Sequence, residues 1–234
     1  LAQGGFVPLN KVYQFDPIPK EMSEEASKHI LGAQANLWSE FVPTTSHSEY
    51  MLFPRLAALS ETIWSPKEGR DWKGFSKRLK TQFKRYDALG VNYAKSAYLI
   101  TTDMEVDLDS KSVKMVLKNE FPNSDIRYVL GKGTINDATQ YKNPIEINET
   151  TIVNASMIED GKPVGKIYTD TIKFHKAVAK NVNYTIPHSD SYKGMGESTL
   201  VKSLRGSKNF RDGQWQAWLR DNMEVVSDLS ETAT

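Results

Sequence analysis

The spacing of apolar residues divides the chain into a helix-forming part and a β-forming part. The clearest helix is predicted to begin after Asp71, a favourable N-cap residue, and to end at Gly90, a typical C-terminal stop. Its apolar stripe, at steps of three and four residues, consists of Phe75, Leu79, Phe83 and Tyr86. Its lysines occupy the remaining positions, which is typical of a solvated helix face.

Helical spacing also predicts a helix from Ser48 to about Trp64. Pro54 lies inside this pattern, so it must occupy the first turn of a helix or kink it. Upstream, the prolines between Pro8 and Pro19 predict an irregular segment, and a short acidic helix is predicted at Lys20–Lys28. The apolar stripe of the longer helix would consist of Leu52, Leu56, Leu59 and Ile63.

Between these helices, Ile30–Trp38 has the pattern of a buried strand. The run is short, mostly apolar and bounded by polar segments. Gly32, Ala33 and Ala35 are small, as expected in a crowded sheet or barrel wall.

From Met104 onward the apolar period shifts towards two, which predicts half-buried strands. About seven short strands in about 90 residues indicate a small β-sandwich. Turns are predicted at Gly131–Gly133 and Gly161–Pro163. The clearest strands are Met104–Leu108, Val113–Leu117, Ile126–Leu130, Pro144–Ile147, Thr151–Met157 and Lys166–Phe174.

Composition narrows the class of protein. The 234 residues are 39% hydrophobic and 25% charged, as in globular proteins, and the net charge of +1 gives no support for nucleic-acid or membrane binding. No apolar run is long enough to span a bilayer, and the first residues do not resemble a signal peptide. There is no cysteine, and the four histidines are not at metal-binding spacing, so we expect neither metal nor cofactor.

The candidate chemistry lies in Trp38-Ser39-Glu40, at the end of the predicted strand. Two residues apart on an extended backbone, Trp38 and Glu40 would point to the same side. An indole face and a carboxylate acceptor together suit a sugar. The alternative is a packed tryptophan beside a structural carboxylate, which this short pattern by itself favours.

The surrounding sequence resembles glycoside hydrolase family 20. His29–Phe41 resembles the family's eighth barrel strand, and Glu49–Ser65 resembles the helix that follows it. Lys11–Pro19 resembles the approach to that strand, and Arg70–Tyr93 contains the family's closing helix. The resemblance covers about residues 8–98 in order.

This resemblance implies that residues 1–96 are the C-terminal portion of a (β/α)8 barrel. Trp38 would then form a wall of the −1 subsite, and Glu40 would accept hydrogen bonds from O4 and O6 of a terminal N-acetylhexosamine. The family's mechanism is substrate-assisted and needs an Asp-Glu pair, but this sequence contains no Asp-Glu dipeptide. We therefore expect no catalytic residue in this chain and no activity by itself. Arg55 and Glu61 are expected to form a structural ion pair.

Two further resemblances complete the predicted organisation. Residues 97–187 resemble the small β-sandwich of the chitobiase and hexosaminidase C-terminal type. Residues 188–234 resemble the start of a discoidin-like carbohydrate-binding module. Burial statistics favour a packing role for its two tryptophans, Trp215 and Trp218.

The resemblance predicts a segment of an exo-acting β-N-acetylhexosaminidase with a substrate-assisted retaining mechanism. Its partners would be a glycan with terminal N-acetylglucosamine or N-acetylgalactosamine and the N-terminal part of the barrel. Export is expected from the family. The alternative is a non-catalytic carbohydrate-binding or scaffold unit built from the two β modules.

Overall fold

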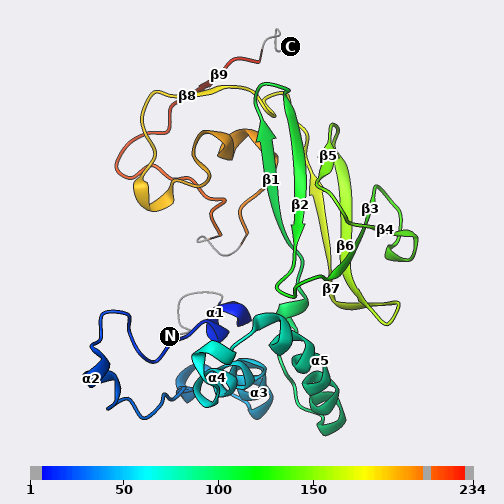
Figure 1. Ribbon diagram of the computed structural model, residues 1–234. Helices are drawn as coiled ribbons and strands as arrows, with labels where there is room; N and C mark the ends of the chain where they lie inside the picture. The colour runs from blue at the N-terminus through cyan, green and yellow to red at the C-terminus, as the bar shows by residue number, and fades with distance from the viewer. Residues whose placement is uncertain (1–6, 208–211, 230–234) are drawn as a thin grey trace. The chain divides into compact units, whose positions relative to one another are not determined.

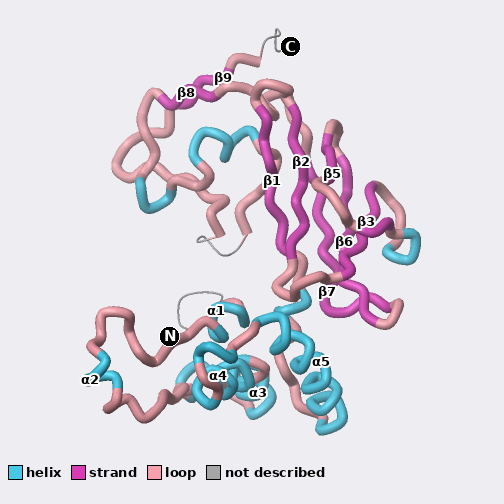
Figure 2. The backbone as a smooth tube through the Cα atoms, viewed as in Figure 1, coloured by secondary structure: helices cyan, strands magenta, loops and turns pink. Residues whose placement is uncertain are grey.

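The computed structural model describes residues 7–207 and 212–229 (Figure 1). The chain divides into two compact units, which Figure 2 shows to differ in secondary structure. The helical unit consists of Val7–Tyr98 and Glu120–Asn123. The β unit consists of Leu99–Asn119 and the described residues from Ser124 onward.

The longest helix of the helical unit, α5 (Trp72–Leu89), confirms the predicted limits. Asp71 is its N-cap, and the carboxylate accepts hydrogen bonds from the backbone N–H groups of Lys73 and Gly74. Gly90 ends the helix in the left-handed region, with φ of 68°. All four residues of the predicted apolar stripe are buried. The other helices are α1 (Leu9–Tyr13), α2 (Glu24–Ser27), α3 (Thr45–Leu52) and α4 (Arg55–Trp64), with 3-10 turns η1 (Ser39–Phe41), η2 (Lys67–Gly69) and η3 (Ser96–Tyr98).

Four predictions about the helices of this unit need correction. The predicted helix from Ser48 to Trp64 is two helices, because Pro54 ends one and becomes the N-cap of α4. Thr44, rather than Ser48, caps α3 by accepting a hydrogen bond from the His47 N–H. The region predicted to be irregular contains α1, since Pro8 fits the N-cap position, and the acidic helix is only the single turn α2.

Aromatic side chains form most of the core of the helical unit. Tyr13 of α1 stacks on Phe75 of α5 with a centroid distance of 4.7 Å, and Phe83 stacks on Tyr93 at the same distance. Phe121 is also buried here, 5.2 Å from the ring of Tyr98. Although Glu120–Asn123 lies between two strands in sequence, it therefore belongs to the helical core.

The predicted strand at Ile30–Trp38 is wrong. The segment has no regular secondary structure, and its residues are exposed or half-exposed; Leu31 is 99% exposed. Within the described part of the helical unit, no segment is assigned as a β-strand that could pair with it. An apolar run cannot form a sheet by itself, because each strand needs a neighbouring strand to satisfy its backbone N–H and C=O groups.

The β unit contains two antiparallel sheets besides a small terminal one. The three-stranded sheet has the order β1-β2-β5, and the four-stranded sheet has the order β4-β3-β6-β7. The strands are β1 (Thr101–Asp107), β2 (Ser112–Lys118), β3 (Asp125–Leu130), β4 (Thr139–Gln140), β5 (Ile145–Ile147), β6 (Thr151–Glu159) and β7 (Lys162–Ile172). Six of them match predicted strands, and β4 is the additional one.

A two-residue turn connects the longest pair of strands, β6 and β7. Asp160 and Gly161 join β6 to β7 with φ of 48° and 74°, the two positive values that a two-residue hairpin turn requires. The turn at Gly131 lies where the sequence predicted it, whereas the turn predicted at Gly161–Pro163 is formed by Asp160 and Gly161, and Lys162 and Pro163 begin β7. The register of β6 and β7 shifts between Ala155 and Met157, which marks a bulge.

Each of the two larger sheets has a buried apolar face. The predicted alternation holds best in β2, where Val113, Met115 and Leu117 are buried. Of the three apolar residues predicted to be buried in β1, Met104 is buried and Val106 is half-buried. Leu108 is exposed, because the strand ends at Asp107. Buried residues of the four-stranded sheet are Ile126, Val153, Ala155, Ser156, Met157, Ile158 and Ile172.

The end of the described chain folds with residues before the predicted boundary at 188. Strand β8 (Val182–Tyr184) pairs with β9 (Val225–Ser227) in a two-stranded antiparallel sheet. The Ala179 N–H also donates a hydrogen bond to the Val201 carbonyl at 2.9 Å. Residues 179–184 are therefore structurally continuous with the terminal segment.

Candidate functional site

Trp38 and Glu40 lie on the exposed connection between α2 and α3. Trp38 is 69% exposed and precedes the 3-10 turn η1, in which Glu40 is also exposed. The backbone between them is therefore not extended, so the geometric reason for placing both side chains on one side does not hold. Among the described residues, Glu40 has no hydrogen-bond or ion-pair partner, which leaves both of its oxygens available to a ligand.

The structure holds this connection firmly on its C-terminal side. The Asn92 N–H donates to the Glu49 carboxylate at 2.8 Å, and the Asn92 side-chain amide donates to Ser46. The Ala94 N–H donates to the Phe53 carbonyl at 2.9 Å. Because these bonds tie both ends of α3 to the chain after α5, the exit from the Trp38–Glu40 segment is fixed. Sequence reasoning missed Asn92 as an anchor, since its partner lies 43 residues away.

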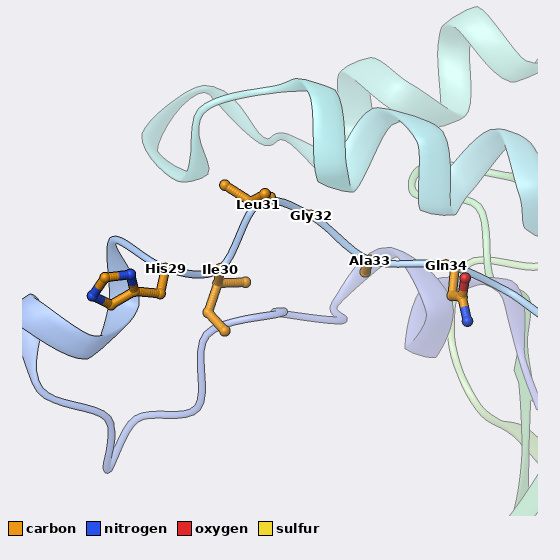
Figure 3. A pocket seen from close by; sticks show the side chains of 6 residues that line it. All are labelled: His29, Ile30, Leu31, Gly32, Ala33 and Gln34. Carbon is orange, nitrogen blue, oxygen red and sulfur yellow. The ribbon is translucent and has the colours of Figure 1, made fainter.

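On its N-terminal side the same connection forms an open hollow of about 560 Å³ (Figure 3). Six consecutive residues line it, from His29 to Gln34. Figure 3 shows the side chains of Ile30 and Leu31 pointing to opposite sides of the chain. A ligand site normally draws polar groups from several elements towards one point, so this hollow is a bend of an unpaired segment and not a built site.

The predicted ion pair between Arg55 and Glu61 is wrong. Glu61 accepts hydrogen bonds from Arg78 at 2.5 Å and from the Tyr13 hydroxyl at 2.9 Å. Burial, reinforced by Glu61, raises the pKa of Tyr13. Arg55 instead donates to the carbonyl groups of Val7 and Met51. Both side chains are thus structural, as expected, but with different partners; six residues apart on a helix, they do not lie on one face.

Among residues 7–207 and 212–229, no three histidine or acidic side chains converge on a point where they could ligate a metal ion. Within the same ranges, none of the helices has the length and hydropathy needed to cross a bilayer.

The chemistry available at this site is that of binding. Trp38 offers an indole face, and Glu40 offers carboxylate acceptors for hydroxyl donors. Both groups are exposed, so each is accessible to a polar ligand that also has an apolar face.

Two family models match different stretches of the chain. The model of glycosyl hydrolase family 20, catalytic domain, matches residues 1–67. A model described as Fn3 associated matches residues 115–172, which include parts of both larger sheets.

Several β-hexosaminidases are similar to part of this chain. A β-hexosaminidase of Porphyromonas gingivalis is 41% identical over 93 residues, which are 40% of this chain and 12% of that protein. A β-N-acetylhexosaminidase of Cellulomonas fimi is 30% identical over 96 residues, 40% of this chain and 18% of that protein. The β-hexosaminidase subunit beta of Mus musculus is 35% identical over 79 residues, 34% of this chain and 15% of that protein.

The matched stretches thus span less than a fifth of each of these relatives. The family match includes Trp38, Glu40 and the approach to them. Residues 1–67 are therefore similar to a part of the catalytic domain of glycosyl hydrolase family 20.

Proposed function

We propose that this chain is a segment of an exo-acting β-N-acetylhexosaminidase, a glycoside hydrolase that removes terminal N-acetylhexosamine from glycans. The observation that carries this proposal is the family 20 match over residues 1–67, together with the relatives named β-hexosaminidase. The mechanism proposed for the whole enzyme is substrate-assisted and retaining.

In this proposal Trp38 and Glu40 are substrate-binding residues. The indole of Trp38 stacks on the C–H face of the terminal sugar, and the Glu40 carboxylate accepts hydrogen bonds from its outer hydroxyl groups. Their exposure supports this role, because neither side chain is buried within the helical unit and both remain accessible to a ligand. The anchoring of α3 by Asn92 would limit the movement of Glu40 when substrate binds.

The remaining strands of the barrel are the proposed partner of the helical unit. They would pair with Ile30–Trp38, cover Leu31 and supply the acid and the residue that orients the acetamide. The sequence of this chain contains no Asp-Glu dipeptide, so its own contribution is binding and not proton transfer. Export of the enzyme and a choice between N-acetylglucosamine and N-acetylgalactosamine are part of the same proposal.

The finer organisation is proposed as follows. Residues 1–96 are the end of a (β/α)8 barrel, residues 97–187 contain a small β-sandwich, and residues 188–234 are the start of a discoidin-like module, with which residues 179–184 pair through β8. A hydrogen bond at 3.5 Å from the Thr102 hydroxyl on β1 to the Tyr168 hydroxyl on β7 supports the face-to-face packing of the two larger sheets. Burial raises the pKa of Tyr168 to about 12, consistent with its position between sheets.

The test compares the isolated chain with a full-length family 20 enzyme that contains it. The isolated chain should not hydrolyse a chromogenic N-acetylglucosaminide. In the full-length enzyme, Glu40→Gln should lower kcat/KM by about 10–200-fold, because a charge-assisted hydrogen bond to substrate is worth about 1.5–3 kcal/mol. Glu25→Gln, on exposed α2, is the matched control and should leave kcat/KM unchanged. Turnover by the isolated chain, or full activity of Glu40→Gln, would refute the proposal.

A further inference from the structure

Helix α5 carries a row of lysines on the side away from its buried aromatic stripe. Its 18 residues include six basic side chains and a single acidic one, Asp87. With about 100° of rotation per residue, Lys73, Lys77 and Lys84 fall within about 40° of one another in projection and span about 16 Å of the helix axis. All three side chains, called the lysine row below, are exposed.

The lysine row is electrostatically unfavourable for the helix that carries it. Lys73 lies in the first turn, where the helix dipole disfavours a cation, and this turn contains no acidic residue. Lys73 and Lys77 lie four residues apart, a spacing at which like charges destabilise a helix. Lys80 and Lys84 repeat this spacing. A merely solvated helix face usually mixes both signs of charge, so the departure from that pattern favours a binding role.

No carboxylate of the described chain neutralises the lysine row. Its three ammonium groups form no ion pair among residues 7–207 and 212–229. Two other basic side chains of α5 do have structural contacts. Arg78 is paired with Glu61, and Lys80 Nζ lies 5.8 Å from the centroid of the buried Phe121 ring. The row is thus distinct from the basic residues that stabilise the helical unit, and its charge is available to a ligand.

The geometry of the lysine row selects a linear anionic ligand. Three cations in line match charges that repeat along a polymer. No aromatic side chain of α5 is exposed, so a nucleic-acid base would find no stacking surface. Leu89 is the one large apolar side chain exposed on α5, which leaves little to insert into a bilayer. An anionic polysaccharide needs neither feature, because its sulfate or carboxylate groups bind ammonium groups directly.

We propose that the lysine row of α5 is a docking surface for a linear polysaccharide that carries sulfate or carboxylate groups. The choice of a glycan among anionic polymers rests on the proposed function, whereas the row of uncompensated charge does not. The surface would hold an acidic glycan chain on the helical unit through ionic contacts and would not cleave it.

The test uses the whole 234-residue chain and two probes, a heparin octasaccharide with sulfate groups and a hyaluronan octasaccharide with carboxylate groups only. Calorimetry should detect binding of at least one probe in about 50 mM NaCl, and roughly tenfold weaker binding in about 200 mM NaCl, because binding releases counterions. Replacing the row in Lys73→Gln/Lys77→Gln/Lys84→Gln should weaken binding by roughly tenfold or more. The corresponding triple replacement by arginine keeps the charge and should retain binding.

The matched control is Lys162→Gln/Lys166→Gln/Lys173→Gln, which removes the same charge from exposed lysines in and directly after β7 and should bind like the native chain. Three results would overturn the docking surface: no binding of either probe, equal loss in both glutamine variants, or tighter binding of duplex DNA or phosphatidylglycerol vesicles than of both glycans. Circular dichroism checks that each variant remains helical. Glu40→Gln should bind the probes like the native chain, so failure here is distinguishable from failure of the proposed hydrolase function, which is measured by turnover.

Discussion

Two nine-residue segments of this chain, β6 (Thr151–Glu159) and Ile30–Trp38, are both rich in apolar residues, but only β6 forms a paired strand. Strand β6 lies between β3 and β7, with Val153, Ala155 and Met157 buried. Ile30–Trp38 pairs with no strand among the described residues and exposes Leu31 and Trp38. The partner of β6 follows after a two-residue turn, whereas within Val7–Tyr98 the described chain offers Ile30–Trp38 no strand at all. Apolar content therefore allows a segment to become a buried strand, but the segment forms one only where a neighbouring strand can pair with its backbone.

The largest expected effect is that of Phe121, which lies between β2 and β3 in sequence and packs in the helical unit. Phe121→Ala should lower the free energy of unfolding of the helical unit by about 3–5 kcal/mol, because the ring is buried beside Phe83 and Tyr98. Urea unfolding followed by circular dichroism measures this. Phe15→Ala, at an exposed phenylalanine of the same unit, should change stability by no more than about 0.5 kcal/mol. Equal effects of the two variants would show that Glu120–Asn123 is not part of the helical core.

The second prediction compares the two nine-residue segments directly. Met157→Ala in β6 should destabilise the β unit by about 2–5 kcal/mol, because it leaves a cavity in a buried sheet face. Leu31→Ala should alter stability by less than about 0.5 kcal/mol, since that side chain is already in solvent. Thermal melts of both variants check the pair. A large loss from Leu31→Ala would show that Ile30–Trp38 is buried in solution.

The third prediction concerns a buried cation in the β unit. Lys202 is fully buried, and among the described residues its ammonium has no hydrogen-bond partner. Burial lowers the pKa of Lys202, and Asp103 and Asp212 only partly oppose this shift. Since a buried ammonium without a partner is costly, Lys202→Met should stabilise the β unit by roughly 1–4 kcal/mol at neutral pH.

The pH dependence of this variant provides an independent check. Because the pKa of Lys202 is lower in the folded than in the unfolded state, the unfolded chain binds the proton more tightly. The stability of the native β unit should therefore rise with pH between the folded-state pKa and the ordinary value of 10.5. The difference in Tm between Lys202→Met and the native chain should shrink over that interval. A constant difference would mean that Lys202 is paired in solution.

Features that depend on residues close together in sequence could be predicted, and hydrogen bonds between residues far apart in sequence could not. Asp71 and Gly90 delimit α5, and the Asp160-Gly161 turn joins β6 to β7, as local propensities predict. The pairing of Glu61 with Arg78 and of Glu49 with Asn92 was missed, because these partners are 17 and 43 residues apart and periodicity carries no information about them. For the candidate site, the residues could be named from the sequence, but the 3-10 turn at Ser39–Phe41 could not.

The sequence by itself determined the limits of α5, six of the strands, the position of two turns and the resemblance to family 20, because each depends on neighbouring residues or on their order. Only the tertiary structure decided that Ile30–Trp38 is unpaired, that Phe121 belongs to the helical core and that Trp215 is exposed while Trp218 is packed. These outcomes depend on which distant groups are available to satisfy backbone hydrogen bonds and cover apolar surface. Such availability is a property of the folded chain and not of any single segment.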